Sequence, residues 1–152
     1  TDKIKIAIEK TNQEIPSVNI CLEDGTWSGL TFHGVPGGHE FTSFILGIYN
    51  VAGPGQKIEQ TYLERIDKIN KEINIKIIVS LSCTMCPELV TSAQRIASLN
   101  KQITTEVYDI QHFKQLKDQY QIMSVPCMVI NDQKVVFGKK NIEQILEIIE
   151  NV

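Results

Sequence analysis

The fold of this chain is decided by residues 75–87, which read Ile-Lys-Ile-Ile-Val-Ser-Leu-Ser-Cys-Thr-Met-Cys-Pro. The apolar run at 75–81 is typical of a buried β-strand, and the apolar spacing after it predicts an amphipathic helix over about 86–99. Cys83 and Cys86 therefore lie where a strand ends and a helix begins. The helix dipole and the free N–H groups at its start favour the thiolate of the first cysteine. The pattern predicts two-electron exchange between thiol pairs.

The bulk composition limits the classes of protein that fit. The chain has 152 residues, a net charge of −3 and 42% hydrophobic residues, which suits a compact soluble protein of one or two small domains. This charge does not support nucleic-acid binding, and only Arg65 and Arg95 could offer a planar fork to a phosphate. No run of about 18 apolar residues is present, so we expect no membrane span.

The ends and the cysteines of the chain suggest where it works. The N-terminal Thr-Asp-Lys does not resemble a signal peptide and lacks a starting methionine, so we interpret the chain as a processed or excised fragment. The closely spaced cysteine pair points to redox or metal chemistry in a reducing compartment, which predicts a cytoplasmic protein.

The second half of the chain alternates between strand and helix patterns, which predicts an α/β fold in the order βαβαββα. Its last helix has Asn141 as N-cap with Gln144 three residues on, the spacing of a capping box. The expected elements are strands at 75–81, 105–110, 127–130 and 135–137, and helices at 86–99, 113–120 and 141–152.

The first half repeats part of this order. Residues 15–20 parallel residues 125–130, with proline in second place, and each segment is followed by an acidic turn, a strand reaching a glycine and an amphipathic helix. Residues 3–9 are expected to match the strand at 105–110. The first copy has no counterpart of the strand at 75–81, the cysteine pair or the helix after it; either the given sequence begins after them or this half has lost them.

A glycine-proline-glycine break separates the two halves at residues 53–55. The apolar residues that follow predict a connecting helix at 56–73, because they space as one helical face. So short a connection predicts that the halves pack as one body. The residues of that face are Ile58, Tyr62, Ile66, Ile69 and Ile73.

Disulfide exchange assigns different roles to the two cysteines. Cys83 is expected to be the exposed nucleophile, and Cys86, one turn into the helix, is expected to resolve the mixed disulfide. The alternative is half of a zinc site, which needs two further ligands, usually closely spaced. No second Cys-x-x-Cys is present and the remaining cysteines and histidines are scattered, so we expect no metal.

Ser124-Val125-Pro126, which precedes a predicted strand, resembles the thioredoxin/glutaredoxin superfamily. The resemblance implies a cis Val125–Pro126 bond facing the Cys-x-x-Cys and a Val125 backbone that pairs with a substrate strand. Thr84 and Met85 would complete the substrate-binding surface.

Residues 38–43, Gly-His-Glu-Phe-Thr-Ser, together with residues 80–87, resemble the N-terminal domain of the alkyl hydroperoxide reductase F subunit. In that family the domain is a tandem of two thioredoxin-like folds, and only the second keeps a cysteine pair. The resemblance implies two such folds packed as one body, with a truncated, degenerate half at 1–55, the connecting helix at 56–73 and the half with the cysteine pair at 74–152.

The function that this resemblance implies is that of a dithiol–disulfide oxidoreductase in hydroperoxide detoxification. Two electrons would pass from a thioredoxin-reductase-type flavoprotein module, in the same or a separate polypeptide, to the disulfide of a peroxiredoxin. FAD and NAD(P)H are expected on that module, since neither has a binding motif in these 152 residues. The alternatives are a general protein disulfide reductase, similar to glutaredoxin or disulfide isomerase, and a docking module with a structural cysteine pair.

The chain departs from the family at the site itself. Thr84 and Met85 stand between the cysteines in place of His-Asn, which leaves the redox potential open, and Cys127 follows the proline in place of a small apolar residue. If Pro126 is cis, Cys127 would lie beside the active pair, as a small buried residue or as a partner in alternative disulfides. Cys21 is expected in the core of the first half.

Glu40 is the candidate for proton transfer. It shares a helix face with Phe44 and Ile48, and burial near Cys86 would raise its pKa toward the range useful for an acid or base. The alternative is a carboxylate that only suits the positive end of its helix. The adjacent His39 is interpreted as a surface residue.

Overall fold

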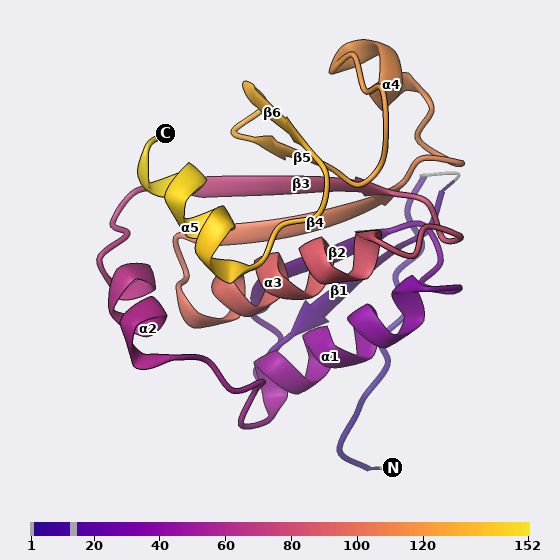
Figure 1. Cartoon of the computed structure of the whole chain (residues 1–152). Helices are drawn as coiled ribbons and strands as arrows, with labels where there is room; N and C mark the ends of the chain where they lie inside the picture. Colours follow the sequence, from indigo (N-terminus) through magenta and orange to yellow (C-terminus); the bar gives the residue numbers. More distant parts are fainter. Residues whose placement is uncertain (1, 13–14) are drawn as a thin grey trace.

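A computed structural model describes residues 2–12 and 15–152 of the chain, which form one six-stranded sheet with five helices packed on it (Figure 1). The elements are β1 (Ser17–Cys21), β2 (Trp27–His33), α1 (Glu40–Ala52), α2 (Gln60–Asp67), β3 (Ile73–Val79), α3 (Cys86–Leu99), β4 (Ile103–Asp109), α4 (Gln115–Gln119), β5 (Cys127–Ile130), β6 (Lys134–Phe137) and α5 (Ile142–Glu150).

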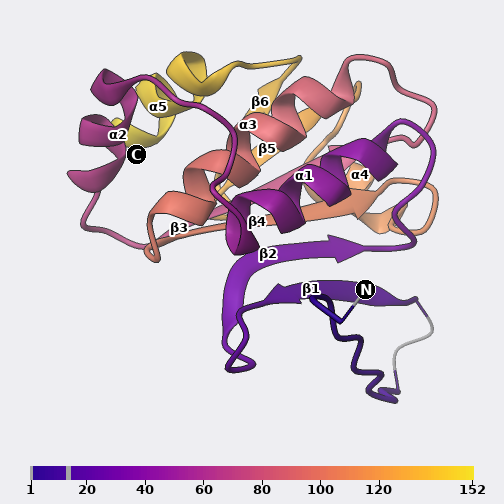
Figure 2. The same cartoon turned by 90° about the horizontal axis from the view of Figure 1, so that it is seen from below.

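The sheet combines a parallel centre with a hairpin at each edge. Its strand order is β1-β2-β4-β3-β5-β6; β2 and β3 both run parallel to β4, and the outer pairs are antiparallel. Helices α1, α2, α3 and α5 cover one face, and α4 covers part of the other (Figures 1 and 2). Because β2 and β3 are parallel, their C-terminal ends lie on the same side of the sheet. The loops that lead into α1 and α3 therefore start from that side.

Strand β3 forms the centre of the core. Ile75, Ile77, Ile78 and Val79 are all fully buried, because β4 and β5 flank the strand and helices cover both of its faces. A strand in this position is apolar on both sides, which explains why its sequence is a nearly continuous apolar run. The predicted capping box of α5 is confirmed, with Asn141 and Gln144 bonded reciprocally.

The internal repeat is present in the backbone. In the first copy the Gly34 N–H donates to the carbonyl oxygen of Pro16 at 2.8 Å, and in the second the Gly138 N–H donates to that of Pro126 at 2.9 Å. Both glycines have positive φ, 115° and 84°, a conformation that strongly favours glycine. In each copy, a backbone hydrogen bond thus joins the proline before the first strand of the hairpin to the glycine after its second strand.

Two expectations about the first half are wrong. Residues 3–9 form no strand, and Ile4, Ile6 and Ile8 are exposed, because alternating apolar residues form a strand only beside a neighbouring strand and the described sheet begins with β1 at Ser17. The connecting helix is shorter than the predicted 56–73: α2 covers only Gln60–Asp67, and Ile73 begins β3.

In the described part of the chain, no helix is long and apolar enough to cross a membrane.

A polar network lies on the sheet between β2, β3 and β4. His33 Nε2 lies 2.9 Å from Glu106 Oε1, Asn74 Nδ2 donates to Glu106 Oε2 at 2.9 Å, and the His33 ring stacks on Tyr108. The hydrogen bond with His33 is the main cause of a lowered pKa at Glu106. The ionised carboxylate therefore stabilises the contact between the two halves.

Glu106→Gln is expected to lower the free energy of unfolding at pH 7 by about 1 kcal/mol, because the charged acceptor is lost. The higher free energy of unfolding of the wild type is present above the unfolded-state pKa of Glu106, about 4.3. It disappears as the pH falls through the lowered pKa of Glu106 in the folded state. Urea unfolding at pH 7 and pH 3 measures both quantities. Glu72→Gln, at an exposed position outside this network, is the control, and an advantage that persists undiminished at pH 3 would contradict the prediction.

Candidate functional site

The cysteine pair lies in the loop between β3 and α3. Cys83 and Cys86 form a disulfide with their Cα atoms 5.6 Å apart. Cys83 is half-buried in a turn in which its N–H donates to the Ser80 carbonyl oxygen, whereas Cys86 is fully buried as the first residue of α3. The two sulfurs thus differ in access from solvent.

No side chain of the described residues accepts a hydrogen bond from the N–H groups at the start of α3, beside the cysteine pair. Met85 occupies the N-cap position and no side chain caps the helix there, while Pro87 lies in the first turn, where a missing N–H removes no helical hydrogen bond. The remaining N–H groups of the first turn and the positive end of the helix dipole are free to stabilise a cysteine thiolate.

The Val125–Pro126 peptide bond is cis, as the family resemblance implies. Val125 and Cys83 both pack against the main hydrophobic core, which contains Cys86. Strand pairing of β5 with β3 begins only at Cys127, opposite Ile78, so the backbone of Val125 lies outside the ladder. Thr84 and Met85 are exposed between the cysteines.

A backbone hydrogen bond joins the first half to the residues just before the cysteine pair. The His39 N–H donates to the Leu81 carbonyl oxygen at 2.9 Å. Gly38 has a positive φ, and a Cβ added there would come within 2.4 Å of that same oxygen, so the approach requires glycine. The contact sets the start of α1 against the loop that carries Cys83. His39 itself is exposed.

Glu40 is a buried carboxyl group at this junction. Its side chain is 0% exposed, and neither carboxylate oxygen has a hydrogen-bond partner among the described residues. Burial raises the pKa of Glu40 to about 6, an effect that the nearby Ser43 hydroxyl partly offsets. The side chain is therefore placed to change its protonation state near neutral pH, which a carboxylate at a solvated helix start would not do.

Asp109, a second buried acid at the same sheet edge, was missed by sequence reasoning. It ends β4 opposite Val79, accepts a hydrogen bond from the Gln111 N–H at 3.0 Å and lies 3.9 Å from His112 Nε2. Its place in an alternating strand, just before a turn, was the available signal. Because its Oδ1 accepts the Gln111 N–H, Asp109 caps the turn after β4.

The structure confirms one expectation about the remaining cysteines and corrects two. Cys127 is buried, as one of the two predicted alternatives has it. It does not lie beside the disulfide, however: it packs with Ile78 and Leu116 on the α4 face of the sheet, because successive strand residues point to opposite faces. Cys21 is exposed rather than in the core, since a bulge after Ile20 ends the regular register of the edge strand β1.

A strand, a Cys-x-x-Cys and a helix, with a cis-proline loop packed into the same cluster, define a thioredoxin-fold redox domain. The sequence profile of the family described as thioredoxin domain matches residues 73–150, and the chain belongs to this family. The chain is a homologue of the N-terminal domain of the alkyl hydroperoxide reductase F subunit. A crystal structure of that domain from Enterococcus faecalis is 40% identical with a TM-score of 0.84, covering 93% of this chain and 66% of that one.

Curated relatives extend well beyond this chain. An NADH dehydrogenase of Ferdinandcohnia aciditolerans is 35% identical over 143 residues, and the alkyl hydroperoxide reductase F subunit of Pseudomonas aeruginosa is 33% identical over 146 residues. These alignments cover 93% and 96% of this chain but only 27% and 28% of the relatives. A protein disulfide oxidoreductase from Aeropyrum pernix, 24% identical with a TM-score of 0.78, shares the fold; the match covers 91% of this chain and 60% of that protein.

Alkylation of the reduced protein with iodoacetamide at pH 8 should modify Cys83 and Cys21 and spare Cys127. Burial raises the pKa of Cys127 to about 11, so only about one thiol in a thousand is ionised at pH 8. Peptide mass spectrometry over a time course measures the three rates, and a denatured sample is the control in which Cys127 reacts. Modification of Cys127 in the folded protein as fast as Cys21 would contradict this assignment.

Proposed function

We propose that this domain relays two electrons from a thioredoxin-reductase-type flavoprotein module to a disulfide on a peroxiredoxin. The observation that carries the proposal is the asymmetric Cys83–Cys86 disulfide at the uncapped start of α3, in a homologue of the N-terminal domain of the alkyl hydroperoxide reductase F subunit. A purely structural disulfide has no need of one partly accessible sulfur at a helix N-terminus.

The exchange balances in two steps. The Cys83 thiolate attacks one sulfur of the partner disulfide, so that a mixed disulfide forms and the partner's other sulfur leaves as a thiolate. Cys86 then loses its proton and attacks the Cys83 sulfur, which closes the Cys83–Cys86 disulfide and releases the second partner thiol. The domain has been oxidised by two electrons and the partner reduced by two; a reduced flavoprotein dithiol reverses the change on the domain.

Substrate binding is assigned to the rim of the disulfide. The backbone of Val125, beside the cis bond to Pro126 and outside the β5 ladder, is free to pair with an extended segment of the partner. Thr84 and Met85 would contact the same segment from the cysteine loop, because both are exposed there.

The electron donor is placed on a separate module. The chain carries no G-x-G-x-x-G dinucleotide fingerprint. The relatives named as an NADH dehydrogenase and as the alkyl hydroperoxide reductase F subunit are more than three times as long as the aligned region, which leaves room for FAD and nicotinamide sites outside it. We assign both cofactors to that part of a parent protein or to a separate flavoprotein.

Glu40 is assigned the proton of the resolving thiol. With both oxygens unpartnered among the described residues and a pKa of about 6, it is ionised at neutral pH and can accept the Cys86 proton as Cys86 attacks. When the domain is reduced again, the protonated carboxyl group returns that proton. Its place at the junction with the cysteine loop, fixed by the His39–Leu81 hydrogen bond, supports this role.

The relay is tested by coupling this chain to a thioredoxin-reductase-type flavoprotein with NADH and an oxidised peroxiredoxin. NADH oxidation is expected to require all three proteins and to fall by more than about 100-fold with Cys83→Ser, because the nucleophile is lost. Cys86→Ser should accumulate a mixed disulfide that non-reducing electrophoresis detects.

The same assay with insulin or glutathione disulfide separates the relay from general disulfide reduction. Faster reduction of insulin than of the peroxiredoxin would favour the general reductase. Full activity after Cys83 is blocked would leave only a docking role and would sink the proposal.

Glu40→Gln is expected to slow resolution of the mixed disulfide by about 10- to 100-fold at pH 7 and above, because no buried base then takes the Cys86 proton. In the wild type the rate should rise through pH 6 as Glu40 ionises, and the variant should lack that rise. Stopped-flow measurements from pH 5 to pH 9 give both profiles. Asp109→Asn, which changes a buried acid whose Oδ1 accepts a backbone N–H, is the matched control. Identical profiles for Glu40→Gln and wild type would remove Glu40 from the mechanism.

A further inference from the structure

The three loops around the Cys83–Cys86 disulfide contain no charged residue. They are residues 34–38 (Gly-Val-Pro-Gly-Gly), 80–87 (Ser-Leu-Ser-Cys-Thr-Met-Cys-Pro) and 121–126 (Gln-Ile-Met-Ser-Val-Pro). Lysine, arginine, aspartate and glutamate make up 22% of the chain as a whole. The absence of charge is therefore a local property of these three loops, which together we call the disulfide rim.

The loops of the disulfide rim adjoin one another. A Cβ added at Gly38 would collide with the Leu81 carbonyl oxygen, so the first loop touches the cysteine loop. The antiparallel register of β5 and β3, continued two residues beyond its last pair, brings Val125 beside Ser80. Figure 1 shows the starts of α1 and α3 at the same side of the sheet. Both halves of the chain thus contribute to one surface around the disulfide.

The connections at the opposite side of the sheet are different. They are the β1–β2 turn, the segment before β3, the turn before β4 and the β5–β6 turn. Each contains at least one charged residue, for example Asp24, Lys71, Lys101 and Asp132 in chain order. Charged residues are depleted from the centres of protein–protein interfaces. The uncharged rim is therefore typical of a surface that a partner protein covers.

Each loop of the disulfide rim exposes a large apolar side chain. Val35 is 60% exposed, Met85 52% and Met123 83%. Exposed apolar groups that gather at one place mark a binding surface, and the flexible thioether of methionine adapts to the shape of a partner. The exposed Ser82 and Thr84 between them are neutral. The rim therefore offers apolar contacts and neutral hydroxyl groups.

The charged residues that border the rim are buried or paired. Glu40 and Asp109 are 0% and 2% exposed. Glu88, which follows the cysteine loop, lies with a carboxylate oxygen 3.3 Å from Lys139 Nζ. These groups are shielded from a segment bound at the disulfide or already have a counter-charge.

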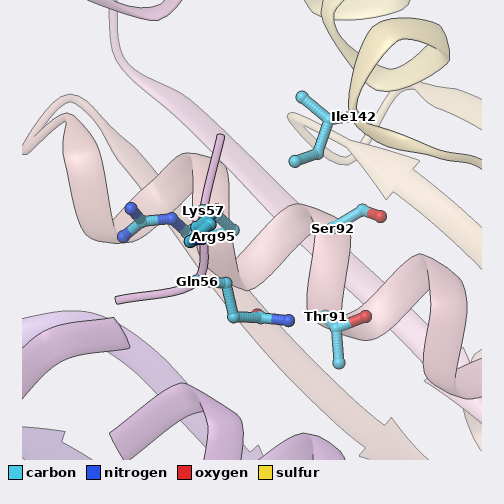
Figure 3. Close-up of a pocket in the computed structure, with 6 residues that line it drawn as sticks. All are labelled: Gln56, Lys57, Thr91, Ser92, Arg95 and Ile142. Carbon is cyan, nitrogen blue, oxygen red and sulfur yellow. The ribbon is translucent and has the colours of Figure 1, made fainter. Parts of the chain in front are cut away.

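Two basic residues near α3 lie away from the rim. Lys57 and Arg95 line a hollow of about 80 Å³ that is formed by α3 and the loop after α1 (Figure 3). Arg95 follows Cys86 by nine residues on the same helix, which places it about 13 Å further along the axis of α3. The positive charge of this hollow is thus separate from the disulfide.

We infer that the disulfide rim recognises an uncharged, largely apolar segment on both sides of the partner's reacting cysteine. The inference rests on the proposed exchange with a protein disulfide, which must bring one partner sulfur into contact with Cys83. Val35 from the first half, and Met85 and Met123 from the second, would contact the side chains that flank that sulfur. The Val125 backbone would pair with the same segment.

The physical basis of this selectivity is the cost of removing water from a charge. A lysine or glutamate beside the partner's cysteine would lose part of its hydration at the rim, and no rim residue would supply a counter-charge. A leucine at the same place gains from burial against the methionines. The rim therefore selects by apolar contact and not by electrostatic attraction.

The test uses the reduced full chain and three peptides, Gly-X-Cys-X-Gly with X as leucine, lysine or glutamate, each joined through its cysteine to 2-nitro-5-thiobenzoate. Exchange releases this chromophore, and stopped-flow absorbance gives the rate. Each rate is divided by that of the same peptide with dithiothreitol, which removes differences in intrinsic reactivity. The leucine peptide is expected to react about tenfold faster than either charged peptide, because only the charged ones lose hydration.

Charge placed on the rim should change this order. Met123→Lys should slow the lysine peptide and speed the glutamate peptide by about two- to fivefold, the effect of one exposed charge. Val35→Lys, in the other half of the chain, is expected to act in the same way. Leu22→Lys, which adds the same charge at an exposed apolar position on the opposite side of the sheet, is the matched control and should leave all three rates unchanged.

The outcomes separate this inference from the proposed relay. Equal normalised rates for the three peptides, or a charged peptide that reacts fastest, would overturn the inference and leave the relay standing. The same response in Leu22→Lys as in Met123→Lys would also overturn it. No exchange with any peptide, in a protein whose Cys83 reacts with iodoacetamide, would contradict the exchange reaction itself. If Met123→Lys does not fold, the comparison of Val35→Lys with Leu22→Lys decides.

Discussion

The contact between Gly38 and the Leu81 carbonyl oxygen is the constraint on which the rest of the site depends. The contact requires glycine at position 38, because a Cβ there would collide with the Leu81 carbonyl oxygen. It also fixes the start of α1 relative to the loop that carries Cys83. Glu40 follows two residues later and is fully buried. The loop that carries the cysteines and the helix that carries Glu40 are thus joined by the backbone hydrogen bond from His39 to Leu81.

Much of the second half could be predicted because its sequence patterns involve residues that are close together in the chain. The two-sided apolar run of β3, the helix beginning at Cys86 and the capping box of α5 each follow from neighbouring residues. The cis bond before Pro126 does not, since a valine-proline pair is usually trans; it followed from the family resemblance.

The failures have a common physical origin. Residues 3–9 alternate as a strand does, but alternation says which way side chains point and not whether a partner strand exists. The face predicted for 56–73 continued past the end of α2 because Ile69 and Ile73 are core residues contributed by a turn and a strand. The position of Cys127 in the chain suggests a place beside the disulfide, whereas the pleat of β5 turns it to the other face. The burial of Glu40 agrees with the helix face on which it was predicted to lie, whereas the burial of Asp109 depends on elements packed around the end of β4.

The pairing of β2 with β4 gives the first half a role that needs no chemistry. Leu30 to His33 occupy the hydrogen-bonding edge of Thr105 to Tyr108. Without them, β4 would present a row of unpaired N–H and C=O groups, which invites edge-to-edge aggregation. The strand β2 of the first half therefore covers the flank of the half that carries Cys83 and Cys86, a role that needs no cysteine pair of its own.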